Sequence, residues 1–79
     1  MSGRVNLEYH VSMFIVDTEM EEDGRWIAEV AELPGVVAYG ETREQAVRRA
    51  QALSLHVLAE RLEHGESIPQ VESVFAIVG

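Results

Sequence analysis

The sequence predicts an α+β domain in which three strands, one helix and a fourth strand follow one another. Three observations support this fold class. Apolar and polar residues alternate over 7–16 and 25–30, as in strands that bury one face. Apolar residues recur at spacings of three and four over 43–63, as along one side of a helix. A last run, 71–78, is apolar on both of its faces and is interpreted as the closing strand.

The first two strands are expected to form a hairpin. In the first strand the odd-numbered residues are expected to be buried, which leaves Phe14 and Val16 on the opposite face. The link between the strands, 17–24, is strongly acidic and ends in an Asp-Gly pair, which favours a turn. Two strands joined by a short polar link predict an antiparallel pair.

The stretch from 32 to 46 is expected to contain a turn, a short strand and the start of the helix. Pro34 fixes its own φ and Gly35 can supply the positive φ of a type II turn, so a third strand can begin at Val36. A Thr followed three residues later by Gln fits the capping box that opens many helices. The residues that define this structural motif are Leu33, Pro34, Gly35, Gly40, Thr42, Gln45 and Ala46.

The order of elements also predicts the sheet. Consecutive hairpins make the first three strands antiparallel, and a right-handed crossover returns the fourth strand beside the first and parallel to it. The result is a four-stranded mixed sheet of order 3-2-1-4 with one helix on one face. Four strands span about 15–19 Å and a helix is only about 10–12 Å wide, so the cover is incomplete. Exposed apolar clusters usually mark interfaces, so we expect a homodimer or larger assembly through Phe14, Val16, Val74, Ala76 and Val78.

Composition limits the possible functions. The 79 residues are expected to form a single domain over 1–79 that needs association to complete its core, since no Cys is present for disulfides or thiolate metal sites. Fourteen acidic and six basic residues give a net charge of −8, which argues against direct nucleic-acid binding. No apolar run approaches the ~20 residues of a membrane span, and no signal peptide is evident, so a cytoplasmic protein without membrane contact is expected.

Neither a metal site nor a catalytic site is expected. Aligned from Glu19, the acidic link fits a calcium loop at Gly24, but Val30 stands where the bidentate Glu belongs. On the first strand, Glu8 and Asp17 would lie about 30 Å apart, too far to share the metal ions of a nuclease. The three His have no Ser, Cys or Asp at triad-like spacing. The acidic link is therefore interpreted as a solvated loop or a docking surface for a basic partner, and no cofactor or enzymatic activity is expected.

Four segments carry a family resemblance. They read DGRWIAEV at 23–30, ELPG at 32–35, GETREQA at 40–46 and GESIP at 65–69. This combination resembles the N-terminal domain of HicB antitoxins of type II toxin–antitoxin modules, in which the corresponding patterns are DGGYVAEV, LPG, GDTxEEA and GxxIP. The resemblance spans roughly 9–69 and implies a partial ribonuclease H-like β-β-β-α-β fold. Ala31 and Val36 depart from the family's usual Pro and Cys.

Many HicB proteins continue into a DNA-binding domain. This chain ends at Gly79, so no C-terminal DNA-binding domain is expected and operator binding is not carried over.

The resemblance implies that this protein binds and occludes a small basic HicA-type toxin, a ribonuclease that cleaves mRNA. Carboxylates placed over such a toxin's active site would substitute for RNA phosphates. The alternative is a stand-alone HicB-like oligomeric scaffold or regulator without a toxin partner. The candidate toxin-binding residues are Glu19, Glu21, Glu22 and Asp23 in the hairpin and Glu41 and Glu44 at the helix start.

Overall fold

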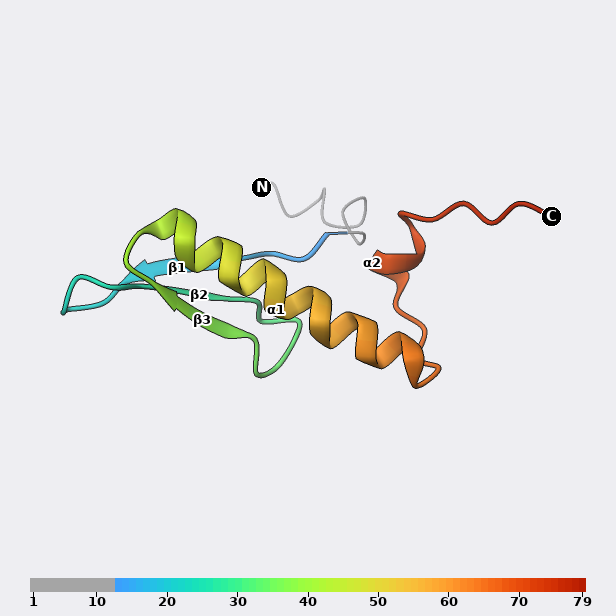
Figure 1. The fold of residues 1–79 in the computed structure, drawn as a ribbon, viewed down its shortest axis with the longest axis horizontal. Coiled ribbons are helices and arrows are strands. Elements are labelled where there is room, and N and C mark those ends of the chain that lie inside the picture. Colours follow the sequence, from blue (N-terminus) through green and yellow to red (C-terminus); the bar gives the residue numbers. More distant parts are fainter. Residues whose placement is uncertain (1–12) are drawn as a thin grey trace, which may run out of the picture.

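The computed structural model describes residues 13–79 as a three-stranded antiparallel sheet crossed on one face by a long helix (Figure 1). Part of the first predicted strand, 7–12, lies outside the described residues. The strand order is β1-β2-β3. The elements are β1 (Asp17–Met20), β2 (Trp26–Glu29), β3 (Val37–Gly40), α1 (Arg43–Glu63) and the short α2 (Pro69–Glu72).

The register of the sheet determines which side chains meet α1. Thr18 lies opposite Ala28, and Ala28 lies opposite Ala38, so the even-numbered residues of all three strands share one face. Ala28, Ala46 and Ala50 are fully buried where α1 packs on this face. These small side chains let the helix approach closely. The predicted α+β class, with one helix on one face of the sheet, is therefore confirmed.

The predicted position and burial of the first strand are wrong within the described residues. Residues 13–16 form no strand, and β1 occupies 17–20, which were predicted to belong to the acidic link. Phe14 and Val16 pack against the core, whereas Met13 and Ile15 are 47% and 49% exposed. The reason is the register with β2, which turns even-numbered residues toward α1. The apolar run at 13–16 satisfies either assignment, and only the partner strand decides between them.

A second core cluster lies beyond the sheet, under the C-terminal half of α1. It contains Val30, Leu33, Val36, Leu58 and Ile68. The predicted turn builds it: the Val36 amide donates to the Leu33 carbonyl at 3.0 Å, and Gly35 has a φ of +92°. This turn is the β-turn with a Gly at positive φ that the sequence predicts.

Both predicted ends of α1 are confirmed. The Thr42 hydroxyl accepts a hydrogen bond from the Gln45 amide at 3.0 Å, and the Gln45 side chain accepts from the Glu41 amide at 2.7 Å. At the other end Gly65 has a φ of +87°, and the Glu66 amide donates to the Arg61 carbonyl at 3.0 Å. This is the Schellman arrangement, which satisfies the last carbonyls of a helix.

The fourth predicted strand is not formed in the described structure. Pro69 begins α2 instead, a hydrogen-bonded turn continues to Phe75, and residues 75–79 extend away from the sheet (Figure 1). The predicted mixed order 3-2-1-4 is therefore replaced by β1-β2-β3. A Pro at the first helical position favours a helix, and Ile68 just before it is buried in the core. The sequence pattern predicted one strand over 71–78 because apolar residues occupy both of its faces.

Candidate protein-binding surface

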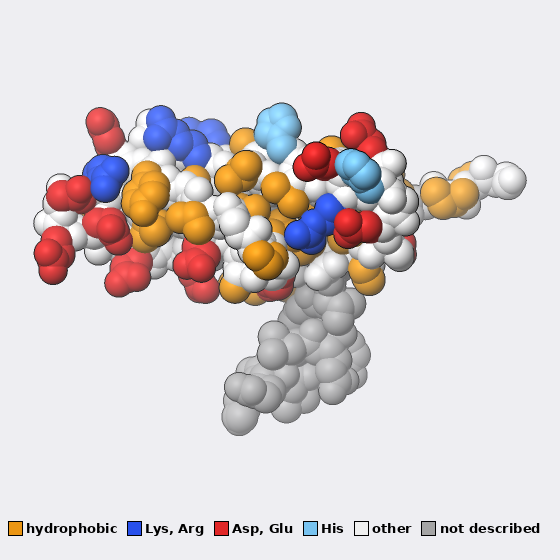
Figure 2. All heavy atoms as spheres, turned by 90° about the horizontal axis from the view of Figure 1, so that it is seen from below, with side chains coloured by type: hydrophobic (Ala, Val, Ile, Leu, Met, Phe, Trp, Pro, Cys, Tyr) orange, Lys and Arg blue, Asp and Glu red, His pale blue; other side chains and the backbone are white. Residues whose placement is uncertain are grey.

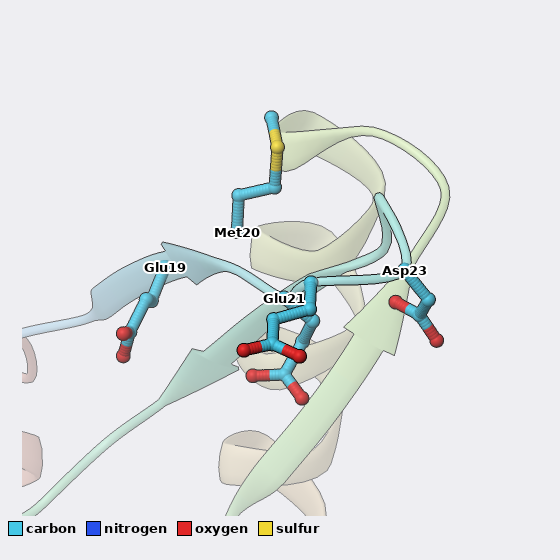
Figure 3. Close-up of a pocket in the computed structure, with 5 residues that line it drawn as sticks. Glu19, Met20, Glu21 and Asp23 are labelled. Carbon is cyan, nitrogen blue, oxygen red and sulfur yellow. The ribbon is translucent and has the colours of Figure 1, made fainter.

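The β1–β2 hairpin presents the predicted acidic residues at one end of the molecule. A tight turn closes it: the Glu21 amide donates to the Arg25 carbonyl at 2.7 Å, and Gly24 has a φ of +90°. Figure 3 shows the Glu19 and Glu21 carboxylates on one side of the hairpin and Met20 on the other, with Asp23 at the tip. The shallow hollow there has a volume of about 420 Å³ and is lined by Glu19, Met20, Glu21, Glu22 and Asp23.

The helix start brings two further predicted carboxylates to the same end. Met20, Trp26 and Gly40 are neighbours across the three strands, so Glu41 begins beside the hairpin, and Glu44 follows in the first turn of α1. Helix residues lie on the α1 side of the sheet, whereas Glu19 lies on the open side. The candidate carboxylates therefore share one end of the molecule but not one face.

The open face of the sheet carries two acidic residues outside the predicted toxin-binding set, Asp17 and Glu29. Asp17 of β1 lies directly opposite Glu29 of β2, and Glu19 follows on the same face. Exposed apolar side chains, including Val37 and Tyr39, flank them on β3. Figure 2 shows acidic side chains crowded at the hairpin end, the left in that view, with hydrophobic side chains exposed beside them. The signal for this surface is register, which joins positions distant in sequence.

The pair Asp17 and Glu29 gives a testable prediction. Like charges directly opposite one another in an antiparallel pair destabilise the sheet, so Glu29→Gln is expected to raise the free energy of unfolding by about 0.2–1 kcal/mol. The gain should shrink in high salt because the repulsion is screened. Urea denaturation at low and high salt measures both effects. Glu32→Gln, at an exposed turn position, is the control with the same change in net charge, and an equal gain in it would contradict the pairwise cause.

Arg25 is held within the hairpin. Its amide donates to Asp23 Oδ1 at 3.0 Å, its Nε donates to Oδ2 at 2.9 Å, and its guanidinium lies 4.8 Å from the centre of the Tyr39 ring. Arg25 and Asp23 form the one ion pair found within residues 13–79. The other carboxylates in this range have no basic side chain of the same range within 4 Å. The hydrogen bond from the Arg25 amide, followed by that from its side chain, lowers the pKa of Asp23.

This lowered pKa can be measured directly. We expect the Asp23 carboxyl to titrate below the ordinary value of about 3.9 in a carbon-detected NMR titration. Because the pKa of Asp23 is lower in the folded state, its ionised carboxylate stabilises the fold at pH values above the pKa of the unfolded state. This stabilisation is lost as the pH falls through the pKa of the folded state. Arg25→Ala should restore the pKa only in part, because the backbone amide remains. Full restoration would show that the side chain, not the amide, is the main cause.

The predicted oligomer-interface residues fall into two separate groups. Phe14 and Val16 line an apolar hollow of about 370 Å³ beside α1, together with Val30, Leu55 and Leu58. Val74, Ala76 and Val78 lie on the exposed C-terminal segment. The described structure does not bring the two groups together.

The described residues offer no group suited to metal chemistry: in 13–79 no three His, Asp or Glu side chains gather closely enough to hold an ion. Nor does either helix in this range have the length and apolar character that crossing a membrane requires. What the surface offers instead is unpaired negative charge beside exposed apolar groups. Comparison with protein-family models, curated proteins and solved structures finds no match for the chain.

Proposed function

We propose that this chain is a HicB-like antitoxin, or antitoxin domain, that binds and occludes a small basic HicA-type toxin. The observation that carries the proposal is the acidic open face, where Asp17, Glu19 and Glu29 converge on two neighbouring strands beside the acidic hairpin. These carboxylates have no basic partner within the described residues. The resemblance of the four sequence segments to HicB antitoxins supports the same conclusion.

The surface has the two components that a tight protein interface needs. Unpaired carboxylates steer a basic partner toward the face and accelerate association. Exposed Tyr39, Val37 and Ile15 supply apolar area beside these carboxylates, and aromatic side chains are frequent anchors of binding energy. Basic side chains of the toxin that otherwise bind RNA phosphates would pair with the carboxylates, and the toxin's active site would be covered. The repulsion between Asp17 and Glu29 would be relieved in the complex.

The proposal extends to the finer fold and to location. A four-stranded mixed sheet of order 3-2-1-4 would form when the C-terminal segment joins the free edge of β1. The chain itself would contact protein rather than nucleic acid, in keeping with its net charge of −8. Because the toxin cleaves mRNA, the encounter would take place in the cytoplasm.

Co-expression with a small basic HicA-type toxin tests the proposal. The wild-type chain is expected to restore growth and to co-purify with the toxin. The open-face variant Asp17→Asn/Glu19→Gln/Glu29→Gln should lose both properties, since it removes the proposed contacts.

The variant Glu32→Gln/Glu63→Gln/Glu66→Gln changes net charge equally at exposed sites elsewhere and should retain both. Equal loss in the two variants would show that bulk charge, not this face, is responsible. Absence of any binding or rescue by the wild-type chain would refute the proposal.

One observation favours the alternative of a stand-alone oligomeric scaffold or regulator. The C-terminal segment exposes apolar side chains that a second copy could cover, whether or not a toxin is present. Self-association together with no toxin binding would support this alternative.

A further inference from the structure

The C-terminal segment 74–78 is exposed and apolar, and it forms neither a helix nor a strand. Its side chains are strongly exposed, with Ile77 and Val78 at 91% and 92%. Its base is fixed, because Ile68 is buried and the Ser67 hydroxyl donates to the Glu72 carboxylate at 2.6 Å. Soluble proteins rarely leave such contiguous apolar surface uncovered, and β-branched and aromatic residues favour strands.

The edge of β1 is the complementary feature. β1 is an outer strand of the sheet, and within residues 13–79 nothing pairs with its outer edge. Free backbone amides and carbonyls along such an edge are a template for another strand. The preceding residues, 13–16, lead into β1 but are not themselves paired in the sheet.

An apolar surface runs along α1 beside this edge. α1 packs mainly on β3 and β2 and only lightly on β1, which leaves the hollow lined by Phe14, Val16 and Leu55. A second hollow of about 270 Å³ next to α2 shares Leu55 and Leu58 with the first, so the two are adjacent. An added strand would rest on this surface.

The pattern of the segment matches both sides of the vacant position. In a strand, Phe75 and Ile77 would face one way, and Val74, Ala76 and Val78 the other. Beside residues 13–16, which precede β1, one side offers Phe14 and Val16, and the other offers Met13 and Ile15. Both faces of the added strand would therefore meet apolar groups, which accounts for a segment that is apolar on both faces.

The direction of the segment selects a second copy as the occupant. The Val74 amide donates to the Val71 carbonyl at 3.1 Å, and the Phe75 amide donates to the Glu72 carbonyl at 3.2 Å. This turn extends α2 and sends the segment away from its own sheet (Figure 1). Residues 75–78 lie beyond this turn and point away from the sheet of their own chain, so they can reach another copy while the turn stays intact.

We propose that residues 75–78 of each copy pair with the β1 edge of another, forming a closed, strand-exchanged dimer. A reciprocal exchange uses the same two surfaces on both copies and leaves neither unpaired. The exchanged segment carries no charged side chain, so it adds no repulsion to the acidic sheet. The inference does not depend on a toxin, and its test uses the purified chain alone.

Light scattering coupled to size exclusion measures the assembly. The wild-type chain is expected to be a dimer at micromolar concentration, and Ile77→Asp should raise the dimer dissociation constant by about a hundredfold, because a charge would be buried in the interface. Ile77 is almost fully exposed in a single copy, so the variant should have the same circular dichroism spectrum as the wild-type chain. Ala52→Asp places the same charge at an exposed position of α1, outside both hollows, and should leave the dimer intact. A monomeric wild-type chain, or a dimer unaffected by Ile77→Asp, would overturn the proposal.

A mixed-label NMR experiment distinguishes exchange from closure within one chain. A nitroxide on Gly79→Cys of an unlabelled copy is expected to broaden amide signals of residues 13–20 in a ¹⁵N-labelled copy and to spare those of β3. Broadening confined to the spin-labelled chain itself would show that the segment folds back, and the exchange would be rejected.

Discussion

Replacing Leu33 by alanine is expected to lower the free energy of unfolding by about 2–5 kcal/mol. Leu33 is 2% exposed and is the largest of the fully buried side chains in the described residues. Val30, Val36 and Leu58 surround it in the cluster under α1, and the turn that holds it is fixed by two short hydrogen bonds. A chain of this length has only about 4–12 kcal/mol of stability, so much of it would be lost.

Urea denaturation followed by circular dichroism measures this loss. Leu55→Ala deletes the same atoms from a side chain that is 67% exposed, and it should change stability by less than about 0.5 kcal/mol. The comparison belongs at a protein concentration low enough to keep the chain monomeric. Equal effects at both positions would contradict the assignment of Leu33 to the centre of the core.

Replacing Gly40 by alanine is expected to cost about 1–3 kcal/mol or more, for the opposite reason. A Cβ at this position would lie 2.5 Å from the backbone nitrogen of Ala46 and 3.0 Å from its Cα. Both atoms belong to the first turn of α1 and cannot move aside independently. The end of β3 and the start of α1 would separate, and the packing of Ala46 on the sheet would loosen.

Gly24 provides the matched comparison for thermal denaturation. It needs its φ of +90°, but a Cβ there would meet no atom within 4 Å. Asn tolerates the left-handed region, so Gly24→Asn should be mild, whereas Gly40→Asn should be at least as damaging as Gly40→Ala. A mild Gly40→Asn variant would show that β3 and α1 can separate without loss.

Local chemistry made much of the fold predictable. The Thr42 cap, the Gly65 helix end and the turn at Gly35 each depend on residues within six positions of one another, and all are confirmed. The second and third strands and the helix follow from the hydrophobic pattern between these points. The first strand does not, because β1 occupies 17–20, which the sequence predicted as part of the acidic link.

Features that depend on distant pairing were not predictable. Whether odd or even residues of the first strand are buried is decided by its register with β2, because apolar side chains occupy both sets at 13–16. The segment 71–78 has the composition of a strand, but composition does not specify which strand it pairs with. Its first two residues belong instead to α2, which begins at Pro69. An apolar strand pattern can therefore indicate a need for pairing without indicating the chain that provides it.

The candidate surface divides in the same way. The hairpin carboxylates were predicted from a continuous acidic run, and the structure places them together at the hairpin end. Glu29 was not predicted to belong to this surface, because its neighbours in the sequence are apolar and it lies opposite Asp17 only once the sheet has formed. Likewise, Glu41 and Glu44 reach the same end through the sheet register but lie on the α1 side.

The most direct test of the acidic open face is an NMR titration of the ¹⁵N-labelled chain with the proposed partner, a small basic HicA-type toxin. We expect the largest amide shifts at Asp17, Glu19, Glu29 and Tyr39, with apparent affinity falling as salt rises. Shifts confined to the outer side of α1, or affinity indifferent to salt, would contradict the assignment of this face as the binding surface.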